Sequence, residues 1–415
     1  MKRSINRARR QLTGLALALA LAGVAAPAAH AAPVTPAVPV AVSPAAGGHP
    51  DGSAGGSRTE TPATRLTLPR PTGPHAVGRS VFPLADHGRP DPWVPASGDR
   101  RLMVTMDYPA LPGPGPRARY AEPEEARLLA KGQSPSPGEN VIRALSEARV
   151  HARTEAVPLP GRHPLVVLSP GFGMARFTLT TLAEDLASRG YVVALVDHAY
   201  ESTGTLFPDG TVTTCAACEA ADTPEELRRV TTGRGQDVSF LLDSLLGDRP
   251  AWRHAGMIDA RHIGMAGHSI GGAAAVSAMA GDDRIRAGVN MDGTFQDPVP
   301  AGGLDGRPFM LLGADKHHRP ATLDPSWDAA WSRLDGWKRW VTVRGAGHLW
   351  FSDAPVLVEQ LGLPPEEGAE LGADRTVALV RSYMAAFFDR HLRHRAAPLL
   401  DGPTPENPEV VFHRP

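Results

Sequence analysis

Residues 267–271 read Gly-His-Ser-Ile-Gly and carry the clearest chemical signal in the sequence. This spacing matches G-x-S-x-G, the pattern of a serine nucleophile on a sharp turn between a strand and a helix. Glycines two residues to either side of Ser269 leave room for such a turn, and mostly small residues follow as far as residue 280. We therefore expect Ser269 to attack the carbonyl carbon of a substrate and to form a covalent acyl-enzyme.

A serine hydroxyl is a poor nucleophile until an imidazole takes its proton, so a histidine must lie on a nearby loop. His348 fits best, because it follows a strand-like run at 339–343 and a Gly-Ala-Gly sequence that lets the loop approach Ser269. His317 and His318 are weaker candidates for the base, since they lie in a charged run that is predicted to be solvated.

The base in turn needs a buried carboxylate to hold its ring, and two residues compete for this role. Asp292 follows the strand-like run 287–291, and Asp315 follows the run 309–312. Either residue gives the chain order Ser, Asp, His of the α/β-hydrolases, so the order of the residues leaves both candidates open.

Backbone amides must stabilise the negatively charged oxygen of the tetrahedral intermediate. One donor is expected from Ile270, directly after the nucleophile, and the other from Phe172, in the loop that follows the run 165–168. Acyl transfer to water needs no cofactor or metal, and we see no dinucleotide-binding or Walker sequence.

Strand-like and helical patterns alternate along the chain, which predicts an α/β-hydrolase fold: a mostly parallel central sheet with helices on both faces. The expected strands are 165–168, 191–196, 262–266, 287–291, 309–312 and 339–343, and the expected helices are 176–189, 223–245, 271–280 and 377–388. Residues 101–108 alternate enough to form an edge strand of the same sheet.

The first 31 residues have the layout of an export signal. Basic residues precede an apolar stretch at 12–26, and an Ala-His-Ala sequence at 29–31 offers a cleavage site. We therefore expect a signal peptide at 1–31 and a secreted, extracellular protein; an uncleaved anchor is the alternative, and the export route stays open.

The rest of the chain divides by composition. Residues 32–64 are rich in proline, alanine, glycine and serine, which predicts a disordered linker. The hydrolase domain is expected at 65–395. Residues 396–415 contain five prolines and no helical period, which predicts a C-terminal tail or a strap over the surface.

Cys215 and Cys218 are the only cysteines. In an exported chain a C-x-x-C pair more often closes a small disulfide than binds a metal, because a metal site needs further ligands nearby. We expect a disulfide, with free thiols or metal chemistry as the alternatives.

Composition and charge exclude several classes of protein. Apolar residues make up 42% of the 415 residues and charged residues 21%, ordinary values for a globular protein with a sizeable core. The formal net charge is −1, so no summed field attracts phosphate backbones or anionic lipid, and nucleic acid is not an expected partner.

Four motifs together resemble the plasma and type II platelet-activating-factor acetylhydrolases and the exported actinobacterial lipase-like proteins similar to them. They are Leu-Pro-Arg-Pro-Thr-Gly-Pro at 68–74, Ser-Pro-Gly-Phe-Gly at 169–173, the nucleophile motif with Gly272, and Val-Arg-Gly-Ala-Gly-His at 343–348. The resemblance runs from about residue 66 to residue 392. The chain departs from it at Pro170, where the animal enzymes have histidine.

The resemblance implies hydrolysis of short or oxidised acyl groups from phospholipids or comparable esters. It also favours Asp292 over Asp315, because the acid of that family follows the first strand after the nucleophile helix. Asp315 remains open, since it lies where bacterial cutinase-like enzymes hold their acid.

The predicted function is therefore that of a serine esterase acting on small-molecule or lipid esters, with transient contact with a lipid surface. A broad lipase or polyester hydrolase is the alternative within the same class, and a secreted, non-catalytic binding protein on a hydrolase scaffold is the alternative of another class. The segment 198–222 is long enough to form a lid or rim. The aromatic residues that could line an acyl pocket, although packing is the commoner role, are Trp327, Trp331, Trp350 and Phe351.

Overall fold

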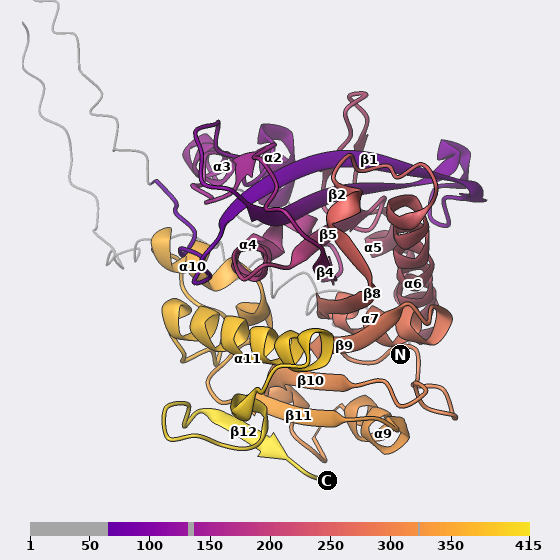
Figure 1. Ribbon diagram of the computed structural model, residues 1–415, viewed down its shortest axis with the longest axis vertical. Coiled ribbons are helices and arrows are strands. Elements are labelled where there is room, and N and C mark those ends of the chain that lie inside the picture. The colour runs from indigo at the N-terminus through magenta and orange to yellow at the C-terminus, as the bar shows by residue number, and fades with distance from the viewer. Residues whose placement is uncertain (1–64, 132–136, 323) are drawn as a thin grey trace, which may run out of the picture.

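The computed structural model describes residues 65–131, 137–322 and 324–415 (Figure 1). The expected signal peptide at 1–31 and the expected linker at 32–64 lie outside these residues. Within the described ranges, no helix combines the length and the apolar composition needed to cross a membrane.

A ten-stranded sheet forms the centre of the described chain, in the order β12-β11-β10-β9-β8-β4-β5-β2-β1-β3 (Figure 1). Its strands are β1 (Ala76–Pro90), β2 (Asp99–Ala110), β3 (Arg153–Thr154), β4 (His163–Ser169), β5 (Val192–His198), β8 (Ile258–His268), β9 (Ile285–Met291), β10 (Phe309–Ala314), β11 (Lys338–Val343) and β12 (Val410–His413). The six strands from β5 to β11 in this order pair in parallel, whereas β2 and β12 pair antiparallel with the outermost of them. The sheet confirms the predicted α/β-hydrolase fold.

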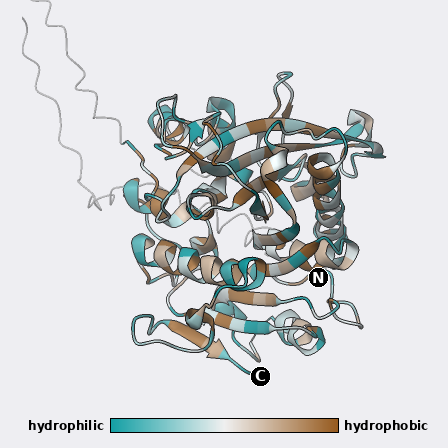
Figure 2. Cartoon of the chain, in the orientation of Figure 1, coloured by the Kyte–Doolittle hydropathy of each residue, from teal (hydrophilic) through white to brown (hydrophobic). Residues whose placement is uncertain are grey.

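Helices cover both faces of the sheet, because alternate residues of each central strand are buried on opposite sides. In β4, Val166 and Leu168 belong to the core beneath one layer of helices, and Leu165 and Val167 to the core beneath the other. The helices on the first face are α2 (Pro123–Lys131), α3 (Glu139–Ser146), α4 (Thr180–Ser188), α10 (Ala354–Gln360) and α11 (Ala373–Arg393). Those on the second face are α6 (Pro224–Leu246), α7 (Ile270–Gly281) and α9 (Ser326–Arg333). Figure 2 shows hydrophobic and hydrophilic residues alternating along α11, as expected of a helix with one face against the sheet.

The N-terminal strands differ from the prediction of an edge strand at residues 101–108. Residues 101–108 lie in β2, which pairs with β5 on one side and with β1 on the other, so they do not form an edge strand. β1 was not expected, because its second half is partly exposed and carries Asp86, His87 and Arg89 instead of an apolar run.

The C-terminal segment 396–415 differs from the predicted tail or surface strap. It contains a short 3-10 helix, η5 (Pro398–Leu400), and then β12, which pairs antiparallel with β11 at the edge of the sheet. The prolines prevent an α-helix, but an edge strand needs hydrogen bonds on one side only and tolerates the prolines that flank it. The sheet of the hydrolase domain therefore extends beyond residue 395.

The remaining elements surround the ends of the strands. They are the hairpin β6 (Thr205–Leu206) and β7 (Val212–Thr213), the short helices α5 (Ala216–Ala220) and α8 (Asp315–His318), and the 3-10 turns η1 (Pro95–Ser97), η2 (Arg176–Leu179), η3 (Ala255–Met257) and η4 (His348–Phe351). Because parallel strands end at a common edge, the loops after β4, β8, β9, β10 and β11 gather there. All candidate catalytic residues lie in or directly after these loops.

Candidate active site

Ser269 lies on a strained turn between β8 and α7. Its φ is 55° and its ψ is −127°, a conformation that side chains rarely adopt. The turn depends on glycine, since a Cβ atom at Gly271 would collide with the carbonyl oxygen of Ser169, and one at Gly267 would collide with the backbone of Gly271. The result is a serine that projects from the edge of the sheet and is not fully buried.

His348 begins η4, after the short glycine-containing turn that follows β11, and joins Ser269 to Asp292. Its Nε2 lies 3.1 Å from Ser269 Oγ, and its Nδ1 lies 2.6 Å from Asp292 Oδ2. A carboxylate only accepts hydrogen bonds, so Nδ1 carries the proton and Nε2 is free to accept one from the serine. This arrangement can remove the hydroxyl proton as Ser269 attacks and can return it to a leaving group.

Asp292 follows β9 and is held from several sides. Its φ is 61°, in the left-handed region. Oδ1 accepts hydrogen bonds from the Ala314 amide (2.6 Å) and from His318 Nδ1 (2.8 Å). Burial alone would raise the pKa of Asp292, but the charge of His318 and the hydrogen bonds from His318 and His348 outweigh it and hold this pKa well below its usual range.

The pKa of His348 is raised. Burial acts to lower it, but the hydrogen bond and the negative charge of Asp292 outweigh that effect, and Glu366 adds to the rise. The shift favours the protonated ring that forms when Ser269 gives up its proton.

Asp315, the other candidate for the acid, lies elsewhere. Its Oδ1 accepts a hydrogen bond of 2.6 Å from Thr342 Oγ1, on the neighbouring β11, and lies 4.0 Å from the imidazole of His413 on β12. The structure thus pairs His348 with Asp292 and pairs Asp315 with the C-terminal edge of the sheet.

His318 corrects the prediction of a solvated charged run. Its neighbour His317 is exposed, but His318 is only 5% exposed and reaches the carboxylate of Asp292. The sequence offered no periodic signal for this, because α8 is a single turn. The only sequence clue is that His318 comes shortly after a strand end at the same edge of the sheet.

The two candidate oxyanion donors flank the nucleophile. Ile270 is the first residue of α7, and Phe172 lies in the loop after β4. Among the described residues, neither backbone amide donates a hydrogen bond to another group of the protein. Both amides are therefore available to a substrate oxygen.

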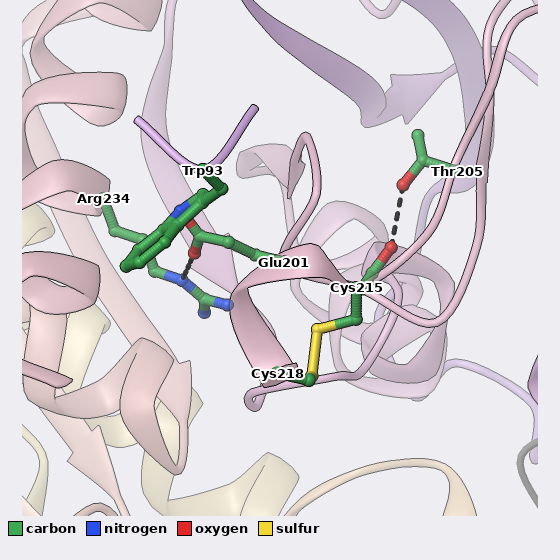
Figure 3. Close-up of a disulfide and its surroundings, with 7 residues drawn as sticks. Trp93, Glu201, Thr205, Cys215, Cys218 and Arg234 are labelled. Carbon is green, nitrogen blue, oxygen red and sulfur yellow. Dashed lines mark hydrogen bonds and ion pairs between the residues drawn. A yellow bond between two sulfur atoms is a disulfide. The ribbon is translucent and has the colours of Figure 1, made fainter. Parts of the chain in front are cut away.

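An arginine buried on α6 braces the loop that carries Phe172. Arg234 Nη1 donates hydrogen bonds to the Pro170 carbonyl and to Ser169 Oγ, and Arg234 Nε donates one of 2.7 Å to Glu201. The backbone carbonyl of Glu201 accepts a hydrogen bond of 3.0 Å from the Gly173 amide. Arg234 thus holds the residues that precede Phe172 directly, and it holds the residue that follows Phe172 indirectly, through Glu201. Figure 3 shows Arg234 directed at the Glu201 carboxylate.

A second serine, histidine and aspartate lie in line behind this loop. Ser169 Oγ is 3.0 Å from His198 Nε2, and His198 Nδ1 is 2.7 Å from Asp237 Oδ2, which also pairs with Arg100. Each of these four side chains is at most 1% exposed, so no substrate reaches them. Burial first, and then the charge of Arg234, lowers the pKa of His198, which keeps its ring neutral. Sequence reasoning missed this network, because its members are far apart in the chain and match no motif.

A disulfide joins Cys215 to Cys218 at the start of α5 (Figure 3). It lies within the segment 198–222, which was predicted to be a lid or rim. A Cβ atom at Gly173 would lie 3.5 Å from Cys218 Sγ, so the disulfide packs against the far end of the Phe172 loop.

Most of the aromatic residues considered for an acyl pocket are core residues. Trp327 is fully buried and donates a hydrogen bond to the Gly293 carbonyl, and Trp350 and Phe351 are at most 4% exposed. Trp331 is partly buried and packs against Trp340.

The apolar side chains beside the nucleophile are instead a group that we call the rim cluster. Phe172, Trp93 and Leu227 are partly exposed and pack against a small buried cluster that contains Ile270. Sequence reasoning missed Trp93 and Leu227, because neither lies near a motif. Among the described residues, no group of three or more metal-ligating side chains could hold an ion.

Comparisons with known proteins relate the chain to ester hydrolases. Residues 138–214 and 217–395 match the family described as platelet-activating factor acetylhydrolase, isoform II. A probable 1-alkyl-2-acetylglycerophosphocholine esterase of Arthroderma benhamiae is 30% identical, over 83% of this chain and 93% of its own length. A platelet-activating factor acetylhydrolase of Cavia porcellus is 21% identical, over 79% of this chain and 78% of its own. The solved structure of a ferulic acid esterase from Streptomyces cinnamoneus is 42% identical and superposes with a TM-score of 0.75, covering 84% of this chain and 99% of that one.

Proposed function

We propose a mechanism and a substrate class for this chain, which belongs to the platelet-activating factor acetylhydrolase, isoform II, family and is a carboxylic ester hydrolase. In the proposed mechanism, Ser269 is the nucleophile, His348 the general base and acid, and Asp292 the residue that orients His348. One observation carries the proposal: the continuous line from Ser269 Oγ to His348 (3.1 Å) and from His348 to Asp292 (2.6 Å), on a strained turn at the edge of the sheet.

The reaction proceeds in two halves. Ser269 Oγ attacks the ester carbonyl carbon while His348 Nε2 takes the hydroxyl proton, and the carbonyl oxygen becomes an oxyanion near the Ile270 and Phe172 amides. The C–O bond to the alcohol then breaks, and His348 gives its proton to the leaving oxygen. In the second half, water attacks the acyl-enzyme with His348 again as the base, and the acid and free Ser269 are released.

We propose that the substrates are esters of small acyl groups, such as the acetyl group of a glycerophospholipid. The name of the Arthroderma relative supports this class. The rim cluster supports it too, because a few partly exposed apolar side chains can bind a short group.

An aromatic acyl group is a second candidate, favoured by the partly exposed rings of Trp93 and Phe172 and by the name of the Streptomyces enzyme, a ferulic acid esterase. We further propose that the protein is secreted. The export pattern of residues 1–31 supports this, as does the disulfide, since disulfides persist mainly in oxidising compartments.

The test is hydrolysis of p-nitrophenyl esters from acetate to palmitate, and of methyl ferulate, by the protein without residues 1–31. Preference for acetate would support the acetylhydrolase class, preference for ferulate the aromatic class, and preference for long chains with higher activity on emulsions a lipase. Ser269→Ala should abolish turnover and labelling by a serine-directed phosphonate. A wild-type protein that neither hydrolyses these esters nor takes up the phosphonate would overturn the mechanism in favour of a binding protein.

A further inference from the structure

The carboxylate of Asp292 is shared between two histidines. Besides His348, it contacts His318, whose Nδ1 lies 2.8 Å from Asp292 Oδ1. The other ring nitrogen of His318, Nε2, lies 3.1 Å from Asp324 Oδ2. Both nitrogens of His318 therefore face carboxylate oxygens.

This geometry sets the protonation state of His318. A carboxylate accepts hydrogen bonds and has none to donate, so both ring nitrogens must carry hydrogen to satisfy both contacts. A neutral imidazole has hydrogen on one nitrogen only. The lone pair of its other nitrogen would then face a lone pair of an aspartate oxygen in a buried place. His318 is consequently an imidazolium, placed between two aspartates.

The surrounding residues fix the ring in this place. The indole of Trp327 stacks on the imidazolium with the ring centres 4.2 Å apart and an angle of 25° between the planes, which suits a cation over an aromatic face. Trp340 Nε1 donates a hydrogen bond of 2.6 Å to the His318 carbonyl. Trp327 Nε1 also holds the Gly293 carbonyl, directly after Asp292. The same two tryptophans thus support His318 and the turn that carries the acid.

We propose that His318 is a positioning residue that stays protonated at the working pH, pins the Asp292 carboxylate toward His348 and limits the basicity of His348. The inference rests on the proposed roles of Ser269, His348 and Asp292. It extends them, because it makes the acid one half of a permanent ion pair.

The electrostatics agree with this assignment. Burial acts to lower the pKa of His318, but the charge and hydrogen bond of Asp292, followed by those of Asp324, raise it to about 9. At His348, Asp292 and Glu366 raise the pKa while His318 lowers it. Without His318, Asp292 would act on His348 undiminished, and the base would be protonated, and inactive, up to a higher pH.

Other titratable groups also face the two rings. The ring of His268, on β8, is centred 4.8 Å from that of His348, and burial lowers its pKa to about 3, so it stays neutral. His317 lies beside His318 on α8; the partial burial of its side chain lowers its pKa, and the nearby Lys316 lowers it further. Glu366 accepts a hydrogen bond of 2.9 Å from the Leu349 amide. None of these groups shares the Asp292 carboxylate with His348.

The test compares His318→Gln with His317→Gln, a matched control that removes a neighbouring imidazole without touching Asp292. The pH dependence of kcat/KM would be measured for both variants and the wild type. His318→Gln should move the acid limb upward by about one pH unit, the lower end of the effect of a nearby charge, so that activity on that limb falls about tenfold more than on the alkaline plateau. His317→Gln should leave the limb in place. If the acid limb of the kcat/KM profile of His318→Gln stays at the wild-type pH, His318 does not limit the basicity of His348, whatever the value on the alkaline plateau.

A second variant guards against misfolding. His318→Gln removes the cation beside Asp324, so His318→Gln/Asp324→Asn removes both charges together and should show the same upward shift of the acid limb. A readout independent of turnover is NMR of ¹⁵N-histidine-labelled protein, in which both ring nitrogens of His318 should remain protonated at pH 7.5. One unprotonated nitrogen there would overturn the inference even if the mechanism holds. Full activity of Ser269→Ala would instead overturn the mechanism and leave the protonation result standing.

Discussion

Removing the arginine that braces the Phe172 loop should lower catalysis more than substrate binding. In the wild type, Arg234 donates to the Pro170 carbonyl and to Ser169 Oγ on one side of Phe172, and to Glu201 on the other. Arg234→Met keeps an unbranched apolar chain of similar length and deletes all three contacts. The Phe172 amide should then lose its fixed direction, whereas the rim cluster, which we propose contacts the substrate, should remain.

The magnitude follows from what the deletion leaves behind. Loss of one oxyanion donor typically lowers kcat by about 100- to 1,000-fold, and a donor that is displaced but present should cost the lower figure, about 100-fold. Breaking a buried ion pair costs about 3–5 kcal/mol when the partner charge is left alone. Glu201 is not left alone, because Arg100 Nη2 (2.7 Å) and Trp93 Nε1 (2.9 Å) still donate to it, so we expect a loss of about 3 kcal/mol.

The assay is steady-state hydrolysis of p-nitrophenyl acetate, with urea unfolding measured in parallel. Arg228→Met is the matched control: it lies on the same α6, and its ion pair with Glu225 is exposed, so it should change neither kcat nor stability appreciably. Arg234→Met should show kcat about 100-fold lower with KM within about threefold. The reasoning would be refuted by a variant that loses the expected stability yet keeps the wild-type kcat, because Arg234 would then hold the core and not the donor.

Three further outcomes follow from the structure. Asp292→Asn should lower kcat by about 10,000-fold, because the amide stabilises the wrong tautomer of the base, while Asp315→Asn should stay within a few-fold; equal losses in p-nitrophenyl acetate hydrolysis would contradict the assignment. Replacing Cys215 and Cys218 together by alanine should cost about 2 kcal/mol in urea unfolding, since a short loop gives a small entropic gain, and a cost near zero would show that the disulfide is strained or unimportant. Burial lowers the pKa of His268 to about 3, so the unfolded chain binds its proton first as the pH falls; this difference should lower Tm as the pH falls below the ordinary histidine value of 6.5, and His268→Gln should flatten that decline in differential scanning calorimetry.

The parts of this molecule that could be predicted from sequence are those with a local or periodic signal. The central strands appear as short apolar runs because both of their faces are buried, and β4, β5, β8, β9, β10 and β11 were all expected near their observed positions. The turn at Ser269 was predictable because its strain requires glycine at fixed offsets, and His348 because a strand and small residues precede it. β1 was missed for the opposite reason: its outer half is partly exposed, and no apolar run marks it.

The residues that support the site carry no such signal. His318 contacts Asp292, and Ser169, His198 and Asp237 contact one another, only after segments far apart in the sequence come together, and each position reads as an ordinary polar residue in the chain. What they share is burial, which depends on packing and which a single sequence does not report for polar side chains.

The choice between Asp292 and Asp315 shows how one unpredicted element can leave a catalytic question open. Asp315 could be assigned to other work only by knowing what packs beside β11, and that neighbour is β12, in the segment predicted to be a tail. Thr342 on β11 donates to Asp315 and lies 2.7 Å from His413 of β12, so the carboxylate, the hydroxyl and the imidazole form one group at the edge of the sheet. Because the Asp315 carboxylate is bound at this edge of the sheet, it is not available to His348. The position of the last few residues of the chain thus bears on the identity of the acid, more than a hundred residues earlier, and no motif around either aspartate could have supplied that information.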